Sequence, residues 1–231
     1  KTDFALIGLF MIAIKLFVPI IGLSMNTIIS RSYHIRNDLG QLLGSALILV
    51  LVLTLLVVCI LILLPNMLYL SMGFKRELAL LSVSASFFMT ISVTLLAFLQ
   101  MREKPVYWGI AMTINTVASV VLTLLLIVLF ELNYLSRVVG IVFGQILSAS
   151  VAYYFVRKFI KISFTITPEH YKYLYKLGIP LLFTALGGWA LVSLDRIFIG
   201  PMLGVEALGL YVFAATLASP VYILQDVYTR V

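Results

Sequence analysis

The sequence has few charged residues and few residues suited to metal or disulfide chemistry. Only 11% of the 231 residues are charged, whereas about a quarter is usual in soluble domains. Cys59 is the single cysteine, so no intrachain disulfide can form, and its place in an apolar segment predicts a buried thiol. His34 and His170 are the two histidines and do not suffice for a metal site. These shortages exclude an ordinary soluble domain.

Motifs for nucleotide hydrolysis and nucleophilic catalysis are also missing. The sequence has no GxxxxGK[ST] phosphate-binding loop, so any energy input would have to come from an ion gradient or from a substrate gradient. It also has no Ser-His-Asp arrangement and no carboxylate pair in a supporting context. We therefore expect a protein that is not an enzyme and that requires neither a cofactor nor a metal.

Long apolar segments account for most of the chain. Hydrophobic residues make up 63% of the sequence, and the mean hydropathy is +1.16. A helix needs about 20 apolar residues to cross about 30 Å of hydrocarbon. Segments of that length fall at about 4–28, 40–65, 78–101, 105–130, 138–156, 178–200 and 204–226. The sequence therefore predicts an all-α polytopic membrane protein with seven transmembrane helices.

The net charge of +7 follows membrane topology and does not indicate nucleic acid. Most Lys and Arg residues lie in short breaks between spans, and no basic stripe interleaved with aromatics occurs elsewhere. Ten of them lie on the side of the 157–177 break and four on the other side. Because loops rich in Lys and Arg stay in the cytoplasm, we expect an inner (cytoplasmic) membrane protein with residue 1 external and residue 231 cytoplasmic.

A short phrase occurs twice in the chain, about 200 residues apart. Residues 7–19 and 208–220 are identical at Gly8/Gly209, Leu9/Leu210, Ala13/Ala214, Leu16/Leu217 and Pro19/Pro220. Many secondary transporters are built by duplication of a helix bundle, so the repeat predicts a fold of two six-helix bundles. We expect an internal fragment in which 1–157 is an incomplete N-terminal bundle, 158–177 a cytoplasmic linker and 178–231 the start of the C-terminal bundle.

Residues 194–211 carry the most specific motif. They read Leu-Asp-Arg-Ile-Phe-Ile-Gly-Pro-Met-Leu-Gly-Val-Glu-Ala-Leu-Gly-Leu-Tyr and resemble the second-half signature of polysaccharide flippases of the multidrug/oligosaccharidyl-lipid/polysaccharide exporter superfamily. That signature has Asp-Arg or Asp-Lys near the outer end of helix seven, a Leu-Gly turn, and Leu-Gly-Leu-Tyr opening helix eight. Looser likenesses at Asp3–Leu6, Leu99–Gln100, Val139–Gln145 and Tyr171–Pro180 extend the resemblance over helices two to eight.

The resemblance implies a transporter with two bundles around a central cavity. Such a protein moves lipid-linked oligosaccharide or polysaccharide precursors outward across the cytoplasmic membrane by alternating access. Its partners would be a polyprenyl-diphosphate-linked oligosaccharide, membrane lipids, and glycosyltransferases or a polymerase of the same pathway.

Three charged residues lie inside the predicted spans, away from the breaks. Lys15 is near the middle of its span, where an ionised side chain costs about 2.5–3.5 kcal/mol. It attracts the substrate diphosphate, or it pairs with a carboxylate of the helix expected before residue 1, or its side chain extends to a membrane interface. Arg196 suits bidentate phosphate contact, with an interfacial anchor or a structural pair as the alternative. Asp195 is the candidate for proton or sodium coupling, and hydrogen bonding that fixes the nearby turn is the alternative.

Two other functions remain open at this stage. A drug or cation antiporter of the same superfamily would need acidic cavity residues, and Asp195 is the only acid well inside a span. A multispan polysaccharide polymerase or ligase would need a large external loop, and the predicted external breaks are short. Lys15 and Arg196 suit an anionic substrate headgroup, which favours the flippase over these two alternatives.

Overall fold

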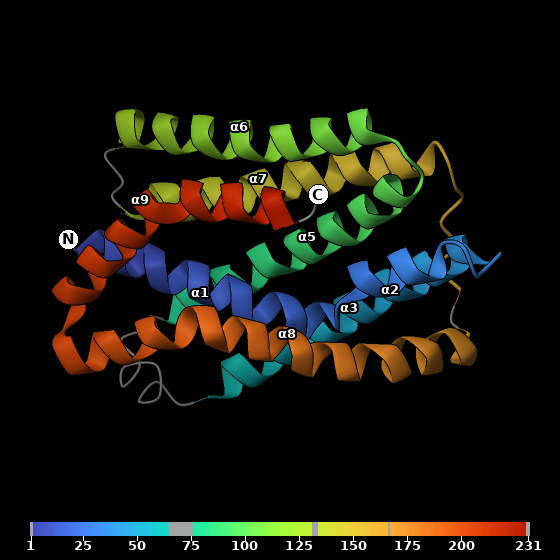
Figure 1. The fold of residues 1–231 in the computed structure, drawn as a ribbon, viewed down its shortest axis with the longest axis horizontal. Helices are drawn as coiled ribbons and strands as arrows, with labels where there is room; N and C mark the ends of the chain where they lie inside the picture. The colour runs from blue at the N-terminus through green and yellow to red at the C-terminus, as the bar shows by residue number, and fades with distance from the viewer. Residues whose placement is uncertain (1, 65–75, 131–133, 166, 230–231) are drawn as a thin grey trace.

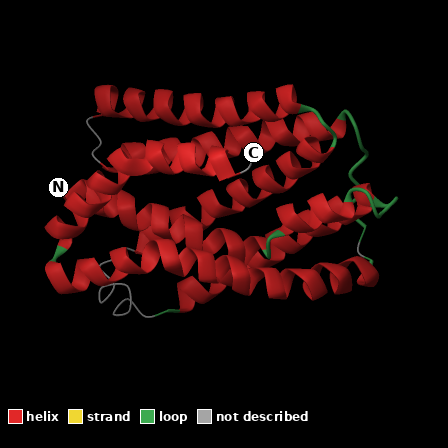
Figure 2. Ribbon diagram, viewed as in Figure 1, coloured by secondary structure: helices red, strands yellow, loops and turns green. Residues whose placement is uncertain are grey.

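The computed structural model is helical throughout the part of the chain that it describes (Figure 2). It describes residues 2–64, 76–130, 134–165 and 167–229. The helices are α1 (Thr2–Gly22), α2 (Met25–Ser32), α3 (Leu39–Leu63), α5 (Arg76–Met101), α6 (Pro105–Phe130), α7 (Tyr134–Arg157), α8 (Pro168–Leu203) and α9 (Val205–Thr229). Long apolar segments without interior polar breaks fold this way because a helix satisfies its own backbone in lipid.

Six of these helices are long and apolar enough to cross a membrane, and they lie roughly along one common direction (Figure 1). They are α1, α3, α5, α6, α7 and α8, and α9 continues the series with an apolar stretch at Glu206–Ala218. The connections 33–38, 102–104 and 158–165 lie together at one end, on the right in Figure 1. We call this the basic end, because most of the Lys and Arg residues in the breaks lie there.

The first predicted span is interrupted, so the prediction of one helix over 4–28 is wrong in detail. α1 ends at Gly22 and α2 begins at Met25. Between them, Leu23 and Ser24 adopt left-handed backbone with φ of 43° and 54°. Pro19 contributes to the break, because it lacks the N–H that would bond to the carbonyl of Lys15 one turn earlier.

The linker predicted over 158–177 is partly helical. Of its described residues, 158–165 and Thr167 lie outside a helix, and α8 then runs for 36 residues from Pro168 to Leu203. Proline at the first helical position starts α8 without loss of a hydrogen bond. The predicted span 178–200 therefore continues a helix that begins ten residues earlier. The domain boundaries themselves stay a prediction.

The core lies among α1, α2, α3, α5 and the basic half of α8. Its largest cluster of buried residues includes Ile21, Leu42, Leu95, Phe98 and Leu174. α6, by contrast, contacts mainly α7 and exposes most of its apolar side chains, as a helix facing lipid would. Cys59 is also exposed, on α3, so the prediction of a buried thiol is wrong. An apolar thiol on a membrane helix needs no burial against protein, because lipid is apolar too.

The two copies of the repeated phrase belong to helices that touch. α1 carries 7–19 and α9 carries 208–220, and α9 packs across α1 (Figure 1). A Cβ on Gly8 would meet the Val212 side chain at 2.6 Å, so only glycine permits this approach. Phe4 and Phe213 add an edge-to-face contact with ring centroids 5.7 Å apart.

Candidate functional site

A cavity of about 480 Å³ lies between α1, the start of α2, α5 and α8. It is bounded by the last third of α1 and by residues near the middle of α5 and α8. Its lining residues are Lys15, Val18, Pro19 and Gly22 of α1, Ser24–Thr27, Thr90, Val93 and Thr94 of α5, and Ala185, Gly188, Trp189, Val192 and Ser193 of α8.

Lys15 is the one charged residue among the lining residues of this cavity. It shares the cavity face of α1 with Val18, Pro19 and Gly22, which follow it at helical spacings of three, four and seven. Its side chain is exposed to the cavity and forms no ion pair within the described residues. The sequence prediction that Lys15 faces the bundle interior agrees with this geometry.

α8 presents a face of small and aromatic residues to the cavity. Trp189 donates its indole N–H to the carbonyl of Ile12 at 3.2 Å, which fixes the ring against α1. Gly188 leaves open space, since a Cβ there would meet no atom within 4 Å. Ser193 is buried and continues the same face one turn further along α8. This side of the cavity is therefore held by a hydrogen bond between α8 and α1.

α5 carries a stripe of hydroxyls at every fourth residue. Ser82 and Ser86 donate to the carbonyls of Leu78 and Ser82, each at 2.7 Å. Thr90 and Thr94 continue the stripe into the cavity lining. Both are buried, and their hydroxyl oxygens have no hydrogen-bond partner among the described residues.

Arg196 and Asp195 lie one turn beyond the cavity lining on α8, next to α9. The Arg196 guanidinium lies 5.9 Å from the centre of the Tyr211 ring, and it is close enough to Lys15 to act on its charge. Asp195 accepts hydrogen bonds from the Arg196 backbone N–H at 2.8 Å and from the Tyr211 hydroxyl. The structure thus brings Lys15 and Arg196 into electrostatic range of each other, and it places Asp195 in the α8–α9 contact.

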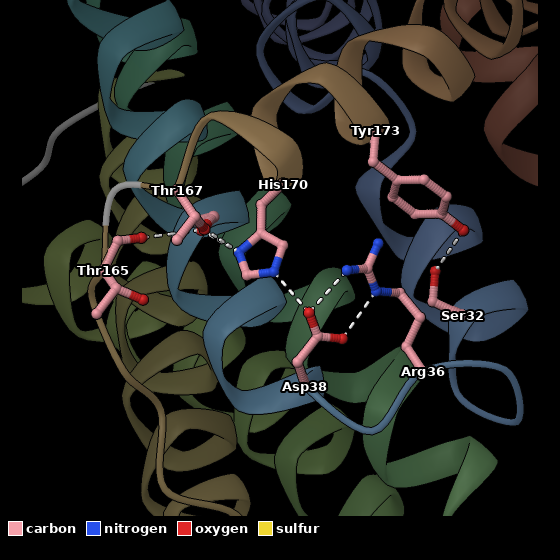
Figure 3. A network of polar contacts seen from close by, with 8 residues as sticks. Ser32, Arg36, Asp38, Thr165, Thr167, His170 and Tyr173 are labelled. Carbon is pink, nitrogen blue, oxygen red and sulfur yellow. Dashed lines mark hydrogen bonds and ion pairs between the residues drawn. The ribbon is translucent and has the colours of Figure 1, made fainter.

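A second polar cluster lies at the basic end and joins α8 to α2 and α3 (Figure 3). Asp38, just before α3, accepts two hydrogen bonds from Arg36 at 2.7 and 2.8 Å. It also lies 2.6 Å from Nε2 of the buried His170 of α8. Tyr173 stacks under the Arg36 guanidinium, 4.9 Å from its ring centre, and shares a hydrogen bond of 3.0 Å with Ser32.

The remaining contacts complete this basic-end network. Nδ1 of His170 is bonded to the Thr167 hydroxyl and lies 3.3 Å from the Ser45 hydroxyl, which donates to the Thr165 carbonyl at 3.1 Å. The Arg36 hydrogen bonds, with a smaller contribution from His170, hold the pKa of Asp38 well below its usual range. The same hydrogen bonds raise the pKa of Arg36. Each residue labelled in Figure 3 thus takes part in at least one hydrogen bond or ion pair of the network.

No group of three or more His, Cys, Asp or Glu side chains comes together anywhere in the described ranges. The chemistry available in the cavity is that of a cation, hydroxyls and an aromatic ring, which bind ligands without reacting with them. No sequence pattern predicts that Trp189 and the first turn of α2 line the cavity. The spacing of Ser82, Ser86, Thr90 and Thr94 was a readable signal, because it places four hydroxyls on one helix face.

Comparison with known proteins agrees with this architecture. Residues 1–225 match the sequence model of the family described as polysaccharide biosynthesis protein. No curated protein matches the chain significantly. A solved structure, an inward-facing conformation of a multidrug resistance MATE family transporter of the MOP superfamily, superposes with a TM-score of 0.68 at 19% identity. The match covers 94% of this chain and 54% of that one, so the chain spans about half the length of the transporter.

Proposed function

Because the chain belongs to the polysaccharide biosynthesis protein family, we propose that the full protein is a flippase that moves lipid-linked oligosaccharide or polysaccharide precursors across the cytoplasmic membrane by alternating access. The fold prediction, an all-α polytopic membrane protein that forms part of a two-bundle transporter fold, is confirmed. The described cavity lining offers groups that bind a ligand, and it shows no nucleophile next to a base. Such a lining suits a transporter better than an enzyme.

The observation that carries the proposal is the charge of the cavity. Lys15 is charged, and none of the lining residues is acidic. Arg196 lies on α8 one turn beyond the cavity lining, so its positive charge adds to that of Lys15. An anionic group bound near both cations is attracted by both. The diphosphate of a polyprenyl-linked oligosaccharide is such a group, and the glycan would occupy the water-filled space beside it.

The charge at the basic end supports an orientation. Its connections carry Arg36, Arg102, Lys104, Lys158 and Lys161, and positive loops are retained in the cytoplasm. We place this end in the cytoplasm, which puts the start of α1 on the external side. The lipid carrier and the enzymes that build it, glycosyltransferases or a polymerase of the pathway, are the proposed partners.

A drug or cation antiporter is the weaker candidate. Cationic cargo calls for a carboxylate in the cavity, and Asp195 is instead bonded to Tyr211 and to the backbone of Arg196. These bonds favour a role in the α8–α9 contact, and coupling to protons or sodium would require Asp195 to exchange them. Efflux of a cationic dye by the full-length protein distinguishes this candidate from the flippase.

The proposal is tested by removing the charge of Lys15 in the full-length protein. Lys15→Gln removes a charged hydrogen-bond donor worth about 1.5–3 kcal/mol, so we expect transport of the lipid-linked oligosaccharide to fall about tenfold to a hundredfold. Transport is measured as surface polysaccharide in cells lacking the native gene, or as movement of the labelled lipid in reconstituted vesicles.

Lys104→Gln is the matched control. Lys104 is exposed at the basic end, where its ammonium lies 5.9 Å from the centre of the Phe159 ring. It lines no part of the cavity, so this variant should transport as the unaltered protein does. Equal transport by Lys15→Gln and Lys104→Gln, at equal amounts in the membrane, would remove the diphosphate role of Lys15 and with it the support for an anionic cargo.

A further inference from the structure

The break between α1 and α2 is held from two sides. A Cβ added to Gly22 would lie 2.7 Å from the Thr90 methyl of α5, so glycine lets the two helices pack closely there. A Cβ added to Gly178 of α8 would lie 2.9 Å from the Leu23 Cβ. Two consecutive residues other than glycine in left-handed backbone cost about 1–2 kcal/mol each. Strain of this kind persists only where the surroundings determine it, and it is concentrated at functional positions.

The break turns the start of α2 toward the cavity. Ser24, Met25, Asn26 and Thr27, which are the residue before α2 and its first three residues, all line the cavity. No side chain caps this helix end. The first backbone N–H groups of a helix lack the i−4 partner and carry partial positive charge. In α2 the Thr27 N–H bonds to the Ser24 carbonyl at 3.0 Å, so the donors that remain in the first turn are the N–H groups of Met25 and Asn26. An uncapped helix start therefore faces the same space as the Lys15 ammonium.

Two hydroxyls beside this helix start lack partners. Thr90 and Thr94 line the cavity, are at most 2% exposed, and have hydroxyl oxygens without a hydrogen-bond partner among the described residues. A buried polar group without a partner is costly unless a ligand or a water molecule bonds to it. Both threonines line the cavity, so a ligand bound there is the partner nearest to these hydroxyls.

We infer that the first turn of α2, Lys15 and the two threonine hydroxyls form one binding site for a phosphate or diphosphate group. The backbone N–H groups of the turn and the hydroxyls donate hydrogen bonds to the phosphate oxygens, and Lys15 supplies the full positive charge. Helix starts bind phosphate in this way because N–H groups and dipole both favour an anion. That this anion is the diphosphate of the transported lipid rests on the proposed function.

The site is tested by an added charge that the fold itself tolerates. Asn26→Asp places a carboxylate in the first turn of α2, where a negative charge favours the helix, yet it repels a bound anion. We expect the purified full-length protein to keep its melting temperature and to bind inorganic pyrophosphate about tenfold more weakly. Asn37→Asp makes the same change at an exposed position outside the cavity and should bind normally.

The other arms identify the donor and the source of the phosphate. Asn26→Ala should bind pyrophosphate almost normally, because the donors are backbone groups; a loss equal to that of Asn26→Asp would assign the contact to the Asn26 amide and overturn the helix-start site. Farnesyl diphosphate, a short prenyl diphosphate, replaces pyrophosphate in a parallel titration. Binding of that lipid alone, with the same sensitivity to Asn26→Asp, supports the site and identifies a lipid headgroup.

Unchanged affinity of Asn26→Asp for both probes, or no binding of either by the unaltered protein, overturns the helix-start site. The proposed function is judged separately, by transport of the labelled lipid-linked oligosaccharide in vesicles that contain the unaltered protein. Transport without an effect of Asn26→Asp would leave the flippase intact and remove only this site. If the unaltered protein neither binds the probes nor transports the labelled lipid, both the site and the flippase function are wrong.

Discussion

The cavity and the basic-end network are both polar regions inside an apolar bundle, and they differ in how their polar groups are satisfied. In the network, Asp38, Arg36, His170 and Tyr173 bond to one another across α2, α3 and α8. In the cavity, Lys15 forms no ion pair within the described residues, and two of the three lining threonines, Thr90 and Thr94, have hydroxyls without a partner there.

This difference separates a structural role from a binding role. Buried polar groups with all partners present hold elements in one arrangement and gain nothing from a ligand. Groups left without partners lower stability until a ligand or solvent meets them. The network therefore fixes α8 to the first helices at the basic end, and the cavity keeps its binding groups available near the middle of the membrane.

The largest difference in unfolding free energy is expected when glycine is replaced by alanine in each of the two regions. A Cβ on Gly44 of α3 would lie 2.0 Å from the Ser163 carbonyl oxygen, beside the network, whereas a Cβ on Gly188 in the cavity would meet nothing within 4 Å. We expect Gly44→Ala to lower the free energy of unfolding by about 1–3 kcal/mol through overpacking. Gly188→Ala should raise it by up to about 1 kcal/mol, because alanine favours the helix.

Thermal unfolding of the purified protein in detergent measures both variants. The contrast holds only if the linker at Ser163 is packed rigidly on α3, as its N–H bond to the Gly40 carbonyl at 3.1 Å indicates. Equal stability of Gly44→Ala and Gly188→Ala would mean that the linker moves aside freely, and the structural role of the basic end would be lost.

Opening the network at its centre should give a smaller difference between variant and control, because this control is neutral whereas Gly188→Ala gains stability. Asp38→Asn removes the charge that binds both Arg36 and His170, and should cost about 1–3 kcal/mol of unfolding free energy. Glu103→Gln, the same change at an exposed position of the same end, should cost almost nothing. Melting temperatures of the two variants decide whether the network or merely local charge stabilises this end.

The pH dependence gives the network a separate signature. Chiefly because of the Arg36 hydrogen bonds, the folded-state pKa of Asp38 lies below its unfolded-state value of about 3.9. The stabilisation is therefore complete above that unfolded pKa and is lost as the pH falls through the folded pKa. From pH about 5 down to about 2, the unaltered protein should lose more stability than Asp38→Asn. Parallel melting curves of the two over that range would contradict the assignment.

Much of this architecture is readable from the sequence, because apolar length decides where a helix crosses lipid. The inward position of Lys15 also follows from the sequence, since a charge in mid-span avoids lipid. The break at Leu23 and Ser24 does not follow, because neither residue favours left-handed backbone. It depends on contacts with Thr90 and with Gly178, more than 60 and 150 positions away in the chain.

The basic-end network likewise depends on contacts between residues that are far apart in the sequence. Its charged and aromatic members lie outside the predicted spans, where charged residues are expected to be solvated. Asp38 and His170 are 132 positions apart, and only the packing of α8 on α3 brings them together. Sequence spacing identifies partners within one helix, such as the hydroxyl stripe of α5, and not partners between helices.

The smallest effect sharpens the comparison by removing one hydroxyl from each region. Ser32 is buried and bonds to the Ile28 carbonyl at 2.7 Å and to the Tyr173 hydroxyl at 3.0 Å, so Ser32→Ala should cost about 1 kcal/mol. Thr94→Val keeps the shape of the side chain and removes a hydroxyl without a partner. Its unfolding free energy should stay the same or rise by up to about 1 kcal/mol, while its affinity for pyrophosphate falls. If thermal unfolding shows Thr94→Val destabilised as much as Ser32→Ala, then Thr94 is as well bonded as the network, and the division between a satisfied end and an unsatisfied cavity is wrong.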